Sequence, residues 1–145
     1  MARNLFVLGL DGFNRVKLAA LPEARECRFH PLLEPEDFQD AAGFPMAELL
    51  ERARGELAGF PGSVDGIIAY MDFPVSTMLP VLCRERGLPA PSLESVLRCE
   101  HKYWSRLEQQ AVIPEHIPAF RLVDPYNPDA LDRLDLDFPF WLKPV

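Results

Sequence analysis

The sequence has few of the residues that several common kinds of site require. Its three cysteines, Cys27, Cys83 and Cys99, include no Cys-x-x-Cys pair. This excludes a disulfide framework or a zinc site from the expectations and predicts a reduced, cytoplasmic protein. The three histidines have no partner at metal-ligand spacing, and no Gly-x-Ser-x-Gly elbow occurs. Neither a metal site nor a Ser-His-Asp triad is therefore predicted.

Positive charge and long apolar runs are also scarce. The 15 lysines and arginines are outnumbered by 22 acidic residues, which gives a net charge of −7. Because phosphate contacts need a surplus of basic side chains on one face, no nucleic-acid partner is expected. The sequence contains no run of about 18 apolar residues, so neither a membrane-spanning helix nor a membrane partner is predicted.

The residues that are present suit a folded protein. The 145 residues match the length of one domain, and 48% of them are hydrophobic, enough to build a core. The chain has 15 prolines, about twice the average frequency, and eight of them lie from Pro89 onward. This change of composition predicts two parts, residues 1–90 and 91–145.

Strand and helix patterns alternate over the first part. The expected elements are a buried strand over Asn4–Leu10, a helix capped by Asn14 and stopped by Pro22, a strand over Glu26–His30, a turn or loop over Pro35–Gln39, a helix over Pro45–Ala58, a strand over Val64–Asp72, and a helix from Phe73 to about Arg86 closed by Gly87. Such alternation with short loops predicts an α/β fold with a Rossmann-like parallel sheet.

The second part has a different pattern. The expected elements are a helix from Leu93 to about Gln110 with a break near Glu100-His101, a buried stripe of Trp104, Leu107 and Ala111 on it, strand-like runs over Ile117–Val123 and Phe138–Val145, and between them a turn over 124–128 and a short helix to Leu134. Because the last run reaches the end of the chain, we expect a piece of a longer protein; the alternative is an edge strand that closes the sheet.

Two short stretches are candidate ligand sites. The turn Gly9-Leu10-Asp11-Gly12 joins the first strand to a helix, where backbone N–H groups favour an anion; the alternative is that both glycines serve turn geometry alone. It matches neither the dinucleotide fingerprint nor the P-loop. Asp72 and Ser76 follow the strand over Val64–Asp72, on the side where parallel sheets bind ligands. Capping of the next helix is the alternative role for Asp72.

Lysine is rare, and two of the three lysines lie in distinctive surroundings. Lys102 begins a helical stretch after the proline-bounded link, and Lys143 lies among aromatic and aliphatic residues near the end. A lysine in such an apolar run must either reach solvent or face an anion. The alternative for both is an ordinary surface lysine.

The order of these features resembles the ATP-grasp superfamily, including its carboxylate–amine ligases and biotin-carboxylase-like members. The stretches that carry the resemblance are the helix, link and capped helix over Val81–Val96, Glu100-His101-Lys102, the turn over Ala111–Pro118, and the aromatic-proline run Leu136–Pro144 that ends in Lys143-Pro144.

The resemblance implies a fold and a function. Residues 1–90 would form the Rossmann-like pre-ATP-grasp domain, and residues 91–145 would begin an α+β ATP-grasp domain. Lys102 and Lys143 would contact the phosphates of ATP. Such enzymes activate a carboxylate as an acyl phosphate, which an amine or another nucleophile then attacks. The small carboxylate substrate would bind near Gly9, Asp11, Gly12 and Asp72.

The resemblance also places several parts outside these residues. The acids that bind Mg²⁺ in such enzymes are expected downstream, so this chain alone is predicted to be inactive. Unpaired strand edges would favour self-association, which makes a homodimer an expected assembly. Two other readings stay open: a small non-catalytic α/β ligand-binding or receiver-like module, and a non-catalytic ATP-grasp relative that acts as a subunit or scaffold.

Overall fold

The structure is a computed structural model that describes residues 2–39, 43, 45–132 and 134–144. The chain divides into two compact units, Met1–Leu93 and Glu94–Val145, which are described separately. Among the described helices, none combines the length and the apolarity needed to cross a bilayer.

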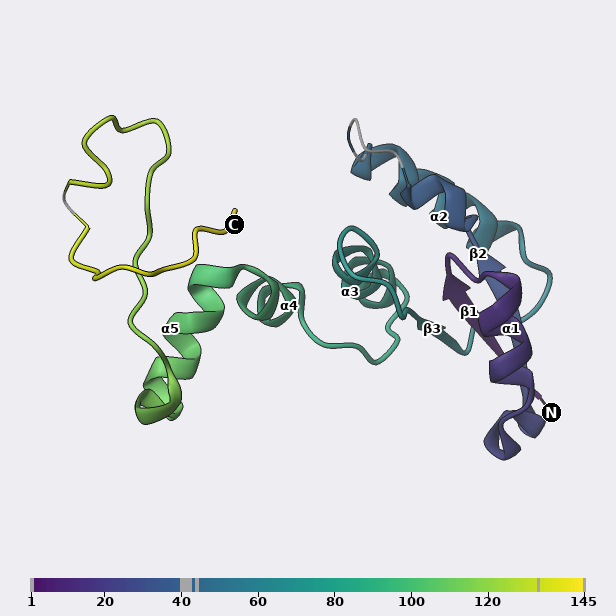
Figure 1. The fold of residues 1–145 in the computed structure, drawn as a ribbon. Helices are drawn as coiled ribbons and strands as arrows, with labels where there is room; N and C mark the ends of the chain where they lie inside the picture. The colour runs from purple at the N-terminus through teal and green to yellow at the C-terminus, as the bar shows by residue number, and fades with distance from the viewer. Residues whose placement is uncertain (1, 40–42, 44, 133, 145) are drawn as a thin grey trace. The chain divides into compact units, whose positions relative to one another are not determined.

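A three-stranded parallel sheet forms the centre of the N-terminal unit (Figure 1). Strand β1 (Arg3–Leu8) lies between β2 (Cys27–Leu32) and β3 (Gly66–Ile68). Its Phe6 stands opposite His30 on one side and Ile67 on the other. The predicted α/β class with a parallel sheet is therefore confirmed.

Strand β3 is much shorter than the strand predicted over Val64–Asp72. Only Gly66–Ile68 pairs with β1. Directly after β1, the chain changes direction at Gly9, whose φ is +62°. Residues after Ile68 consequently have no neighbouring strand on that side, and they form the loop that reaches α3.

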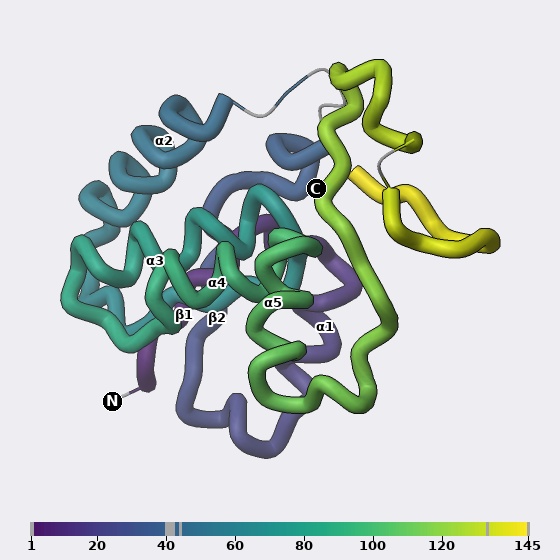
Figure 2. The backbone as a smooth tube through the Cα atoms, turned by 90° about the vertical axis from the view of Figure 1, so that its left-hand side faces the viewer, coloured from purple at the N-terminus to yellow at the C-terminus, as the bar shows by residue number. Residues whose placement is uncertain are grey.

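Helices connect and cover the strands. These elements are α1 (Gly12–Ala19), the 3-10 turns η1 (Pro22–Glu26) and η2 (Pro35–Phe38), α2 (Met46–Gly59) and α3 (Val75–Glu85). Helices α2 and α3 contact each other, α2 contacts β2, and α3 contacts β3. The sheet lies between α3 and α1 (Figures 1 and 2). This arrangement follows from right-handed crossovers that leave β1 and β2 in opposite directions.

The core lies between the sheet and helices α2 and α3. Helix α2 contributes Leu49, Ala53 and Leu57, which recur every four residues and are all buried. These meet the buried β1 residue Leu8 and the α3 residue Met78 in one cluster. Each large aliphatic side chain buried in this way contributes roughly 1.5–3 kcal/mol.

The C-terminal unit contains two helices joined at a sharp break. Helix α4 (Leu93–Glu100), which begins at the last residue of the N-terminal unit, and α5 (Lys102–Val112) are separated by His101, and a short turn η3 (Pro114–His116) follows. The His101 ring nitrogen Nδ1 accepts a hydrogen bond from the Trp104 N–H at 3.3 Å, so His101 caps α5. The predicted break near Glu100-His101 is confirmed.

The chain after η3 is irregular, and two strand predictions are wrong. Neither Ile117–Val123 nor the described part of Phe138–Val145, up to residue 144, pairs as a strand. A strand needs a neighbour, and the described part of this unit offers none. The short helix predicted up to Leu134 is not formed by residues 128–132, which make turns, and residue 133 lies outside the described residues. The turn that begins at Asp124 is confirmed by the hydrogen bond from the Asn127 N–H to the Asp124 carbonyl. Figure 2 shows this segment as the green-to-yellow tube.

The buried stripe predicted on α5 is exposed. Trp104 and Leu107 are 45% and 43% exposed, and Ala111 also lies at the surface. The amphipathic pattern is real, but none of the described residues in Glu94–Val145 is buried. The apolar face of α5 therefore has no covering layer within its own unit.

We predict that stability depends on the N-terminal unit. Leu8→Ala is expected to lower the free energy of unfolding by about 3 kcal/mol, because Leu8 is 0% exposed and its removal leaves a cavity. Leu122→Ala is the matched control, because Leu122 is 58% exposed. Urea unfolding followed by circular dichroism measures both. Equal losses for the two variants would contradict this account of the core.

Candidate functional site

The predicted substrate residues lie at the carboxyl edge of the sheet. Gly9, Asp11 and Gly12 follow β1, and Asp72 follows β3. In the strand order β2-β1-β3, the connection after β1 leads to β2 on one side of it, and the chain then crosses to β3 on the other side. The gap between the carboxyl ends of β1 and β3 is therefore a topological switch point, where open parallel sheets bind ligands.

Gly9 is the point at which three loops meet. Its N–H donates to the Leu32 carbonyl at the end of β2 with an N···O distance of 3.0 Å. A Cβ on Gly9 would lie 2.9 Å from Met71 Sδ and 3.2 Å from the Phe38 ring. With its φ of +62° as well, this position accepts only glycine without strain.

Asp11, not the predicted Asn14, caps helix α1. Its carboxylate accepts hydrogen bonds from the Asn14 N–H and the Asn14 side-chain amide, both at 2.7 Å. Asn14 lies inside the helix and supplies donors to the cap. These bonds, the Asn14 N–H foremost, hold the pKa of Asp11 below its usual range.

Tyr70, for which the sequence pattern predicted no role, joins the β1 loop to the β3 loop. Its hydroxyl lies 2.5 Å from the Gly9 carbonyl oxygen and 2.9 Å from Asp11 Oδ2. Desolvation is the main cause that raises the pKa of Tyr70, so the hydroxyl keeps its proton and donates it. Its position two residues after β3, at the carboxyl edge of the sheet, is the sequence signal that would have found it.

Of the four predicted substrate residues, Gly12 and Asp72 are the exposed ones. A Cβ on Gly12 would meet no atom within 4 Å, so this first residue of α1 leaves space above the loop. Asp72 is exposed, and its Oδ1 accepts from the Phe73 N–H at 2.8 Å. The Asp72 side chain caps none of the α3 amides, because the N-cap position of α3 is Pro74.

Both charged residues among the predicted substrate residues, Asp11 and Asp72, are carboxylates. The Asn14 N–H, which could have bound an anion at the α1 terminus, already serves Asp11. Asp11 and the exposed Asp72 lie in the loops that follow β1 and β3, and the exposed Phe13 comes directly after Gly12. Such a surface suits a ligand group that donates hydrogen bonds, such as an amine or a hydroxyl.

The two predicted nucleotide lysines lie in the C-terminal unit and are exposed. Lys102 is the first residue of α5, and Lys143 lies in the irregular segment near residue 144. Within the described residues, neither lysine side chain forms a hydrogen bond or an ion pair, and no described contact joins the two. Both ammonium groups are available to solvent.

Metal-binding groups and surface cavities are the other features that bear on binding. The described part of the chain holds no group of three or more His, Cys, Asp or Glu side chains arranged to bind a metal ion. A surface cavity of about 680 Å³ lies between α3 residues, among them Val81 and Arg84, and the segment Leu88–Leu93. None of the predicted site residues lines it.

Comparison with protein-family models, with curated proteins and with solved structures gives no significant match to this chain.

We predict that replacement by alanine destabilises the protein at Gly9 but not at Gly12. Gly9→Ala is expected to cost about 2 kcal/mol, because the new Cβ is strained at positive φ and meets Met71. Gly12→Ala is expected to change stability by less than about 0.5 kcal/mol, because its Cβ points into open space. Urea unfolding of both variants checks this. A destabilised Gly12→Ala variant would show that the loop is packed differently.

The lowered pKa of Asp11 predicts a pH dependence. Folding favours the ionised form of Asp11. Its contribution to the free energy of unfolding is therefore complete above the pKa of the unfolded chain, about 3.9, and is lost as pH falls through the lower pKa of the folded chain. Asp11→Asn keeps a capping side chain but cannot titrate. The stability difference between the native chain and this variant should shrink as pH falls from about 5 to 2. Asp37, whose pKa is also lowered, titrates in both proteins and cancels. A difference that does not vary with pH would contradict the prediction.

Proposed function

We propose that this chain supplies the substrate-binding α/β domain and two phosphate-contacting lysines of an ATP-dependent ligase of the ATP-grasp type. In the proposed reaction a carboxylate is activated as an acyl phosphate, with ADP as the leaving group, and an amine or another nucleophile then displaces the phosphate. The N-terminal unit would correspond to the Rossmann-like pre-ATP-grasp domain, and α4 and α5 to the start of the ATP-grasp domain.

The observation that carries the proposal is the switch point between β1 and β3. Gly9, Asp11, Gly12 and Asp72 were selected from the sequence as substrate residues, and all four follow the strands that border this switch point. Tyr70 holds the β1 loop against the β3 loop there. A sheet edge with fixed loops supports substrate binding because little order must be gained on binding.

The charges at this edge narrow the proposed substrate. A bare carboxylate placed at Gly12 would face the ionised Asp11, which disfavours it. The carboxylates of Asp11 and Asp72 instead suit an amino or hydroxyl group elsewhere on the substrate. We therefore propose an amino acid or a hydroxy acid, with its reacting carboxylate directed away from Asp11 toward the phosphates.

The ATP phosphates would be bound by Lys102 and Lys143. A lysine supplies a compact positive charge, and both of these are exposed and without an ion-pair partner among the described residues. Mg²⁺ usually accompanies ATP, but the described residues provide no cluster of acids that fits a metal ion. No step of the proposed reaction is therefore assigned to metal ligands of this chain.

A second candidate is a small α/β module that binds a ligand without catalysis. The observation that favours it is that every buried side chain of the described residues lies between Phe6 and Cys83. The N-terminal unit therefore contains both the whole core and all four substrate residues. In this case the same site would bind its ligand, and Lys102 and Lys143 would have no role.

We predict that ATP binding depends on two of the three lysines. Titration of the ¹⁵N-labelled chain with MgATP should shift amide signals near Lys102 and Lys143. Lys102→Met and Lys143→Met should each weaken binding by about tenfold or more, the effect of one lost charge-assisted contact. Nuclear magnetic resonance titration measures the affinities.

Lys17→Met is the matched control. Lys17 is an exposed lysine of α1 whose Nζ lies 4.4 Å from the centre of the Phe13 ring. Its replacement should leave the affinity for ATP unchanged. If ATP shifts no signals, or if Lys17→Met weakens binding as much as the other two variants, the ligase proposal fails. Binding of a small amine or hydroxy acid at Gly12 without ATP binding would favour the second candidate.

A further inference from the structure

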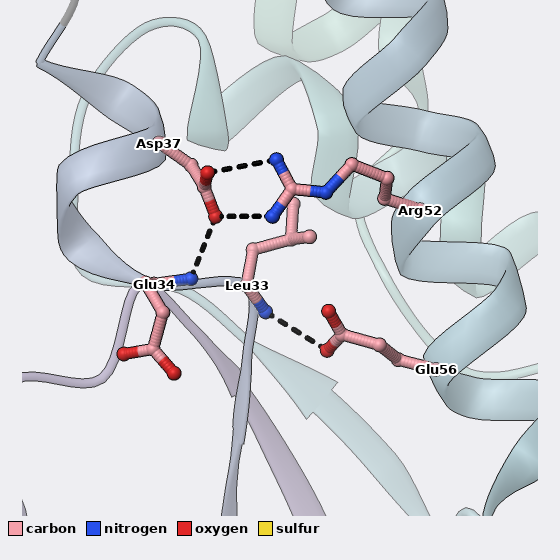
Figure 3. Close-up of polar contacts among 5 residues, drawn as sticks. All are labelled: Leu33, Glu34, Asp37, Arg52 and Glu56. Carbon is pink, nitrogen blue, oxygen red and sulfur yellow. Dashed lines mark hydrogen bonds and ion pairs between the residues drawn. The ribbon is translucent and has the colours of Figure 1, made fainter.

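The turn that follows β2 holds Leu33 in a backbone conformation that leucine does not favour. Leu33 has a φ of +60°, in the left-handed region that β-carbon sterics make costly for a leucine. Its side chain is buried in the core. Its N–H donates to Glu56 Oε2 of helix α2 at 3.1 Å (Figure 3). Without that acceptor the amide of this turn would lack a partner.

A second contact from α2 holds the next turn, η2. The Asp37 carboxylate accepts two hydrogen bonds from the Arg52 guanidinium, at 2.7 and 2.8 Å (Figure 3). The same carboxylate accepts the Glu34 N–H at 2.9 Å, which closes the first turn of η2. Arg52 and Glu56 are four residues apart, so they lie on the same face of α2.

Both held segments contact Gly9 of the proposed site. Leu32, directly before the strained Leu33, accepts the Gly9 N–H through its carbonyl. Phe38 at the end of η2 is buried, and its ring lies 3.2 Å from the position that a Gly9 Cβ would occupy. Two separate routes thus lead from α2 to the same backbone position.

We propose that Arg52 and Glu56 form a latch on the β2 turn and η2, and that opening of this latch loosens the Gly9–Gly12 loop. The two-state element is the Leu33 turn, which is closed when α2 supplies its acceptor and opens locally when it does not. Gly9 then loses its fixed partner Leu32 and its packing against Phe38. The latch goes beyond the proposed function, and it does not depend on which ligand the loop binds.

The test is native-state amide hydrogen exchange of the full chain, without any ligand. Arg52→Met removes the two-bond contact with Asp37, and Glu56→Ala removes the acceptor of the Leu33 N–H. Each variant should speed exchange of the Gly9 amide by about five- to tenfold. The Leu82 amide in α3 reports global opening. Gly9 exchange should rise relative to it.

Two matched controls lie on the same helix. Arg54→Met breaks a similar bidentate pair, because Arg54 bonds to Glu85 of α3 at 2.9 and 2.6 Å rather than to the β2 side. Glu51→Ala removes an exposed glutamate whose Oε1 accepts a hydrogen bond from Arg54 within α2. Neither control should change Gly9 exchange relative to Leu82.

Two outcomes would overturn the latch. One is that Arg52→Met and Glu56→Ala leave the Gly9 rate unchanged relative to Leu82. The other is that Arg54→Met speeds it equally, which would make the effect a general loss of stability. If Arg52→Met fails to fold, Arg52→Lys is measured instead. It keeps the charge but loses the two-bond geometry, so a smaller increase is expected and no increase overturns the proposal. Because no ligand is used, failure here is distinct from failure of the ligase proposal.

Discussion

The pairing of β1 with a parallel neighbour on each side is the constraint on which the rest of the N-terminal unit depends. Parallel strands cannot be joined by a tight turn, so each connection must return across the sheet. The returning segments provide α1 and α2, and buried residues of α2 join the β1 residue Leu8 in the core cluster. All three strands also end at the same edge, and this brings together loops that are far apart in sequence.

Polar contacts at that edge then fix the loops. Tyr70 ties the β3 loop to Gly9 and Asp11, and Arg52 and Glu56 tie the β2 turn to α2. Most of these groups are partly exposed, so each contact is individually modest in water. Their value lies in their convergence on Gly9, where a small backbone displacement would move the whole proposed site. The proposed ligand chemistry follows from the two carboxylates, Asp11 and Asp72, that lie in the loops after β1 and β3.

The C-terminal unit is organised in a different way. Its helices are joined by the His101 cap and by Arg98, which contacts Glu94 of α4 and Glu108 of α5. These are surface interactions, and no described residue of the unit is buried. An amphipathic helix without a covering layer gains little from its apolar face. Lys102 is presented at the start of such a helix, which suits a contact with a soluble phosphate ligand.

Local patterns in the sequence determined β1, α2, α3 and the break before Lys102, because a continuous apolar run, a four-residue repeat and a capping residue act within a few positions. They also placed Gly9, Asp11, Gly12 and Asp72 next to the strand ends. Only the tertiary structure decided that β3 is short, that Asp11 rather than Asn14 caps α1, and that the apolar runs after Ile117 form no strands. It also revealed Tyr70 and the Leu33 turn. Each of these depends on a partner remote in the chain: Tyr70 is 61 residues from Gly9, and Leu33 is 23 residues from Glu56. A strand or a cap is settled by whichever neighbour the fold brings to it, and that information is absent from any short stretch of sequence.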